Sequence, residues 1–103
     1  MDVELQYFEG CPSWQVADAR LATLAAERPD LTVTHRLVES LDEAERLGFH
    51  GSPTILVQGV DPFADPSTPV GFSCRLYPTP EGLAGAPTLE QFRAVLAGPD
   101  QAR

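Results

Sequence analysis

The stretch Phe8-Glu9-Gly10-Cys11-Pro12-Ser13-Trp14 (FEGCPSW) joins two segments with different hydrophobic periods. Before it, residues 3–8 alternate between apolar and polar side chains, which is the pattern of a half-buried strand. Pro12 suits the first turn of a helix, where its missing N–H would have no partner anyway. After it, apolar side chains recur at spacings of three and four, as in an amphipathic helix: Trp14, Ala17, Leu21 and Leu24. The sequence therefore predicts a strand, a turn and a helix, with Cys11 at the junction.

Working outward, the remaining periodic segments complete a β-α-β-α-β-β-α order. They are a strand over 31–37, a helix over 41–47, strands over 54–57 and 72–77, and a last helix from 89. Capping boxes at Ser40–Glu43 and Thr88–Gln91 mark two helix starts, and Gly48 supplies a left-handed cap. A right-handed crossover brings the first two strands together in parallel. We predict one α/β domain over residues 1–98, with a four-stranded mixed sheet flanked by helices, and a tail over 99–103.

The charge of the chain excludes some classes of partner. The 103 residues carry a net charge of −8, and all seven basic residues are arginines without a cluster. We therefore expect neither nucleic acid nor an anionic membrane surface as a partner. The first residues lack a secretory signal pattern, and no apolar stretch approaches the roughly 20 residues that span a bilayer. These features predict a cytoplasmic protein, in which Cys11 and Cys74 would be mostly reduced thiols.

Cys11 has a physical reason to be reactive. The free N–H groups and positive dipole end at a helix N-terminus favour a thiolate. The alternative is a small buried residue, because free cysteines are among the most buried side chains. A second cysteine three positions later would form a local redox pair, but Trp14 occupies that position. Trp14 lies on the apolar stripe, so we expect it to pack in the core and alternatively to shield the thiol.

Two motifs carry a resemblance to the thioredoxin superfamily: Gly10-Cys11-Pro12-Ser13-Trp14, and Gly51-Ser52-Pro53-Thr54 before the third strand. The resemblance covers about residues 3–96. It implies a thioredoxin-like fold, a cis peptide bond at Pro53 beside the reactive cysteine, and a Ser52 backbone able to pair with an extended partner. Trp14 departs from the family pattern, so disulfide exchange through a local cysteine pair is not expected.

The segment Ser73-Cys74-Arg75-Leu76-Tyr77 is similar to a strand that supplies a distal cysteine in some small thioredoxin-like proteins. Some of these resemble the organomercurial (alkylmercury) lyases, which use two separated cysteines and an aspartate. From the residues alone, a cysteine inside a strand is more commonly an inert core residue. If the fourth strand lies beside the third, two spacings of about 4.8 Å separate it from the first, so Cys11 and Cys74 could bond only after movement or through a metal.

Further polar residues have both a functional and a structural interpretation. His50, before Pro53, could stabilise a thiolate or move a proton, although a solvated loop histidine is the default. His35 is expected to be structural. Asp61 and Asp65 lie among prolines and favour turn chemistry over a metal site. Residues 82–85 are predicted to form a loop, because their glycine spacing matches no phosphate-binding pattern.

Together these observations predict a thiol-dependent oxidoreductase without a cofactor, in which Cys11 attacks a disulfide of a protein or small molecule. An external thiol or Cys74 would resolve the mixed disulfide. The candidate substrate-binding residues are Trp14, His50, Ser52 and Pro53. One alternative is binding or cleavage of a thiophilic metal or organomercurial by both cysteines. Another is an interaction module without catalysis. The sequence leaves the substrate, the reductant and the oligomeric state open.

Overall fold

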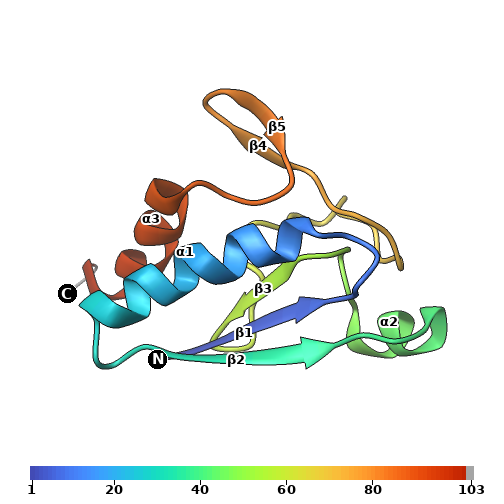
Figure 1. The fold of residues 1–103 in the computed structure, drawn as a ribbon, viewed down its shortest axis with the longest axis horizontal. Coiled ribbons are helices and arrows are strands. Elements are labelled where there is room, and N and C mark those ends of the chain that lie inside the picture. The colour runs from blue at the N-terminus through green and yellow to red at the C-terminus, as the bar shows by residue number, and fades with distance from the viewer. Residues whose placement is uncertain (102–103) are drawn as a thin grey trace.

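The computed structural model describes residues 1–101, and over these residues the chain forms a mixed α/β unit (Figure 1). The elements in chain order are β1 (Asp2–Tyr7), α1 (Ser13–Glu27), β2 (Thr32–Leu37), α2 (Leu41–Leu47), β3 (Thr54–Val57), β4 (Tyr77–Thr79), β5 (Gly82–Ala84) and α3 (Leu89–Gln101). No helix among the described residues is both long and apolar enough to cross a membrane.

A three-stranded sheet with the order β2-β1-β3 forms the centre of the molecule. β1 runs parallel to β2, as predicted from the crossover, and antiparallel to β3. Leu5 on β1 lies between His35 of β2 and Ile55 of β3, and Leu5 and Ile55 are fully buried. This alternation places the apolar side chains of the central strand on one face, where the helices cover them.

Helices α1 and α3 supply the layer that covers this face (Figure 1). The predicted stripe of α1 is confirmed, because Ala17, Leu21 and Leu24 are at most 1% exposed. From α3, Phe92 and Leu96 join the same core. A smaller apolar cluster lies at the end of the sheet near α2 and contains Val38, Ala44 and Phe49. The buried apolar side chains thus form a main core between the sheet, α1 and α3 and a smaller second cluster beside α2.

The predicted helix caps are present. Ser40 accepts a hydrogen bond from the Glu43 backbone N–H at 3.1 Å, and Gly48 ends α2 with a φ of 68°. The Glu43 carboxylate reaches the N–H of Glu39 rather than that of Ser40, so this box is shifted by one residue. At α3 the box is reciprocal: the Gln91 N–H donates to the Thr88 hydroxyl, and the Gln91 side chain accepts from the Thr88 N–H.

The prediction of a fourth strand over 72–77 in the central sheet is wrong. The chain there is irregular apart from one parallel bridge between Ser52 and Cys74, and it enters a separate two-stranded sheet of β4 and β5. The period-two pattern failed because Leu76 is 61% exposed whereas Arg75 is buried. Residues 82–85, predicted as a loop, contribute strand β5 of this hairpin.

The C-terminal end of the domain differs from the predicted boundary at residue 98. Helix α3 continues to Gln101, so residues 99–101 of the predicted tail are helical, and residues 102–103 lie outside the described residues. The helix begins with Leu89 directly after the Thr88 cap.

Candidate redox site

Cys11 and Cys74 form a disulfide that joins two parts of the chain 63 residues apart, with Cα atoms separated by 5.8 Å. This corrects two expectations: the cysteines are not separate thiols, and they bond directly without a metal between them. The predicted separation failed because Cys74 does not lie on a strand beyond β3. It lies instead on a segment that pairs with Ser52, next to the end of β1.

A tight turn and the start of α1 position Cys11. The Cys11 N–H donates to the carbonyl of Phe8 at 3.4 Å, which closes the turn over Glu9 and Gly10. A side chain at Gly10 would lie 2.7 Å from the Phe8 ring, so this turn needs a glycine. Pro12 is the N-cap of α1 rather than its first residue. Cys11 therefore lies just before a helix N-terminus, where a thiolate is favoured when the disulfide opens.

The backbone of Ser52 holds the segment that carries Cys74. The Ser52 N–H donates to the Ser73 carbonyl at 2.8 Å, and the Ser52 carbonyl accepts from the Arg75 N–H at 3.0 Å. The Ser52 hydroxyl accepts from the Phe8 N–H at 3.2 Å and so links this pairing to β1. The Ser52–Pro53 bond is cis, as the resemblance implied. The chain's own residues 73–75, however, occupy the backbone groups that we expected to bind an extended partner.

Gly51 allows residues 73–75 to approach so closely. Its φ is 105°, a backbone conformation that residues with a side chain rarely adopt. A Cβ added to Gly51 would lie 3.0 Å from both the Ser73 carbonyl oxygen and the Arg75 Cβ. A glycine at this position thus permits both the backbone turn and the contact. Any larger residue would strain this turn and press on Ser73 and Arg75, the neighbours of Cys74.

The two cysteines differ in their access to solvent. Cys11 is 1% exposed, whereas Cys74 belongs to the exposed residues of the chain. Cys11 is therefore buried, as its structural alternative expected, whereas Cys74 is not the core residue expected of a cysteine inside a strand. A reagent from solvent therefore meets the disulfide from the side of Cys74.

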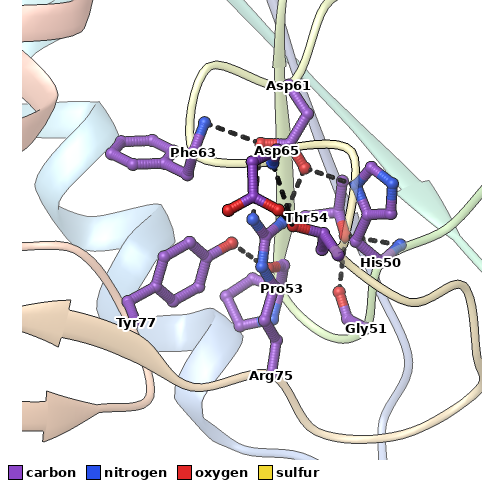
Figure 2. A network of polar contacts seen from close by, with 10 residues as sticks. His50, Gly51, Pro53, Thr54, Asp61, Phe63, Asp65, Arg75 and Tyr77 are labelled. Atoms are coloured by element: carbon purple, nitrogen blue, oxygen red, sulfur yellow. Dashed lines mark hydrogen bonds and ion pairs between the residues drawn. The ribbon is translucent and has the colours of Figure 1, made fainter.

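Arg75, the residue after Cys74, belongs to a charge network with Asp61 and His50 (Figure 2). The Asp61 carboxylate, whose side chain is 4% exposed, accepts from the Arg75 guanidinium at 2.7 Å and lies 2.7 Å from His50 Nδ1. Figure 2 shows Asp61 between these two partners, and its second oxygen accepts from the Phe63 N–H at 2.9 Å. The interpretation of His50 as a solvated loop residue is wrong, since its side chain is only 21% exposed.

Sequence reasoning missed Arg75 and the role of Asp61 as its partner. The available signal was an arginine between Cys74 and the apolar pair Leu76-Tyr77. Such an arginine needs an acidic partner if it is buried, and Asp61 in the preceding loop is a candidate. The Arg75 guanidinium also lies over the ring of Tyr77, 4.4 Å from its centroid, and the Tyr77 hydroxyl donates to the carbonyl of Pro53. Burial raises the pKa of Tyr77 well above its usual range. Through Tyr77, these contacts hold Arg75 against Pro53 at the start of β3.

Asp65 behaves as the sequence predicts. Its carboxylate accepts from the N–H and the hydroxyl of Ser67 at 2.8 and 2.6 Å, which is the turn chemistry of an aspartate before a proline. The hydrogen bonds from Ser67 lower the pKa of Asp65 below its ordinary value. No group of three or more metal-ligating side chains occurs among the described residues.

A cavity of about 530 Å³ opens beside Cys74. His50, Asp65, Arg75 and Tyr77 line it together with residues 67–71. Cys74 lines this cavity, whereas Cys11 is not among its lining residues. The structure therefore brings His50, but not Trp14, to the same space as the exposed cysteine.

Trp14 and His35 have structural contacts elsewhere. Trp14 stacks on Tyr7 with ring centroids 4.1 Å apart and packs against the core, in agreement with its place on the α1 stripe. His35 Nε2 lies 2.7 Å from an oxygen of Asp18 on α1, and both side chains are exposed. Asp18 is thus directed to β2 and not to the disulfide.

No family model, curated protein or solved structure matches the chain significantly, so these comparisons assign it to no family.

Proposed function

We propose that this protein is a thiol–disulfide oxidoreductase of thioredoxin-like architecture, in which Cys11 and Cys74 alternate between a disulfide and two thiols. One observation carries the proposal: two cysteines 63 residues apart meet at the N-terminal end of α1, and one of them is open to solvent. The cis Ser52–Pro53 bond beside them supports the resemblance of the site to that superfamily.

The proposed reaction needs no cofactor. Two thiols reduce the Cys11–Cys74 disulfide and become a disulfide themselves, and the reverse reaction oxidises two external thiols. Because the cysteines lie within bonding distance, either one resolves a mixed disulfide on the other. This arrangement replaces the external resolving thiol that a single reactive cysteine would require.

The test is turnover of a small reference disulfide, with dithiothreitol as the reductant and thiol release as the readout. Cys11→Ser and Cys74→Ser should each lose most of the turnover. Val16→Ser is the matched control, because Val16 is an exposed residue on α1 and lies outside the site. Mass spectrometry should also show that the wild type gains and loses two hydrogen atoms reversibly. Unchanged turnover in both cysteine variants would overturn the oxidoreductase proposal and leave ion binding or a non-catalytic interaction module.

The same pair supports a second candidate, which is binding of a thiophilic ion by the reduced cysteines. Cleavage of a carbon–mercury bond would need a proton donor as well. The aspartate in the cavity wall, Asp65, has a lowered pKa and hydrogen bonds that favour its charged form, and Asp18 is paired with His35. Neither aspartate is therefore placed to supply the proton, and we expect Hg²⁺ binding that is lost in either cysteine variant, with slow or no release of hydrocarbon from an organomercurial.

A further inference from the structure

The cavity beside Cys74 has the size and position of a small-molecule site. Its volume of about 530 Å³ falls within the range of roughly 300–1,000 Å³ that is usual for such sites. It reaches the disulfide through Cys74, whereas Cys11 is 1% exposed. A thiolate that opens the disulfide must reach an accessible sulfur, so the cavity offers Cys74 as the point of attack.

The backbone next to the disulfide is closed to an extended polypeptide. Both the N–H and the carbonyl of Ser52 already bond to residues 73–75. A partner strand would have to displace this segment together with the Arg75–Asp61 ion pair. A small thiol in the cavity needs no such rearrangement, which favours a low-molecular-weight reductant over a protein.

His50 lines this cavity, and Asp61 holds its ring. The Asp61 carboxylate accepts from His50 Nδ1 at 2.7 Å, so the hydrogen of the neutral ring resides on Nδ1. Asp61 is itself fixed by Arg75 at 2.7 Å and by the Phe63 N–H at 2.9 Å. The free lone pair of the neutral ring is then on Nε2. This is the arrangement in which a carboxylate fixes the tautomer of a general base.

The other ionisable groups around His50 cannot take its place near neutral pH. Asp61 and Arg75 neutralise each other in a buried pair. The pKa of Asp65 is lowered by its hydrogen bonds from Ser67, and burial raises the pKa of Tyr77, so neither exchanges a proton near pH 7. Histidine is the side chain that ordinarily does so.

We propose that the cavity binds a low-molecular-weight thiol, and that His50, held by Asp61, removes its proton for attack on Cys74. This inference rests on the proposed oxidoreductase function. The thiolate forms a bond to the Cys74 sulfur, the bond between the two cysteine sulfurs breaks, and Cys11 leaves as a thiolate at the start of α1. A second thiol then attacks the mixed disulfide on Cys74. The small thiol leaves as its own disulfide, and the protein retains two thiols.

The first test compares His50→Gln with His35→Gln, because both histidines lie 2.7 Å from an aspartate but only His50 lines the cavity. The rate of reduction of the oxidised protein by 2-mercaptoethanol is measured from pH 6 to pH 10. His50→Gln should be about tenfold slower or more at pH 7. The difference from the wild type should shrink toward pH 10, where a much larger share of the reagent is already a thiolate. His35→Gln should follow the wild type throughout.

The second test blocks the cavity without altering the charge network. Val70→Trp, at a wall residue that is 48% exposed, should slow reduction by 2-mercaptoethanol at every pH, whereas Val60→Trp, 65% exposed and away from the wall, should not. The comparison of Val70→Trp with Val60→Trp tests whether the thiol reacts through the cavity, even if His50→Gln fails to fold. Rapid alkylation and mass spectrometry should find the transient adduct on Cys74.

The outcomes separate the inference from the function on which it rests. A wild type that does not cycle between disulfide and dithiol overturns both. Normal cycling, with the adduct on Cys11 or with both His50→Gln and Val70→Trp matching the wild type, overturns the inference alone. Faster reduction by a dithiol protein than by any small thiol, unaffected by Val70→Trp, would show that the partner is a protein.

Discussion

Reduction of the Cys11–Cys74 disulfide should lower the free energy of unfolding by about 4 kcal/mol. The cross-link joins residues separated by 63 positions, and it removes the corresponding freedom from the unfolded chain. For a loop of that length the chain-entropy relation gives a loss of about 14 cal/mol/K, or ~4 kcal/mol at 25 °C. For a domain of about 100 residues, this corresponds to a fall in Tm of roughly 15–30 °C.

The assay is equilibrium urea unfolding at pH 7 of the oxidised wild type, the reduced wild type and Cys74→Ala. The reduced wild type and Cys74→Ala should unfold at similar, lower urea concentrations. The m-value of the oxidised protein should be smaller, because its cross-linked unfolded state exposes less surface. Cys74→Ala should not respond to reductant, which controls for effects of the reagent itself.

Coinciding unfolding curves for the oxidised and reduced wild type would refute this reasoning. The result also bears on function through a thermodynamic cycle. The free energy by which the disulfide stabilises the fold equals the free energy by which the fold stabilises the disulfide. A thiol should therefore reduce the chain more completely in urea above the unfolding transition than below it.

Three further predictions concern packing and charge. Phe92→Ala, at a fully buried ring of the α1–α3 core, should cost about 3–5 kcal/mol in chemical denaturation. Arg75→Met should cost about 3–5 kcal/mol, because it leaves Asp61 buried without its cation, and adding Asp61→Asn should restore part of the loss. Arg93→Gln should raise the pKa of Glu27, which the Arg93 hydrogen bond lowers. The stabilisation of the fold by this ion pair is present above about pH 4.5 and is lost as the pH falls through the lower pKa of Glu27 in the folded protein. An NMR titration should therefore give a higher pKa for Glu27 in the variant than in the wild type.

The elements that the sequence predicts well are those whose signals are local. The strand over 3–8, the α1 stripe and the Ser40 and Thr88 caps each depend on residues within one or two turns of chain. The parallel pairing of β1 with β2 follows from the length and hand of the connection between them. In each case the physical cause lies within the segment that carries the pattern.

The predictions that failed depend on contacts between distant segments. Arg75 is buried only because Asp61, 14 positions earlier, neutralises it, and a period-two pattern cannot contain that information. Cys74 meets Cys11 because Gly51 permits close approach of residues 73–75 and Ser52 pairs with them. The hairpin of β4 and β5 has strands of three residues each, which are too short for their alternation to identify them.

The contacts that hold residues 73–75 explain how a distal cysteine can replace a local one where Trp14 stands. Two backbone hydrogen bonds to Ser52 and the Arg75–Asp61 ion pair do not involve sulfur, so we expect them to persist when the disulfide opens. Cys74 then remains next to Cys11, and the two thiols have a high effective concentration for each other. A mixed disulfide on Cys74 would therefore have its resolving thiol in place before the reaction starts. In a chain with this geometry, a second cysteine at the position of Trp14 would compete for Cys11 rather than assist it.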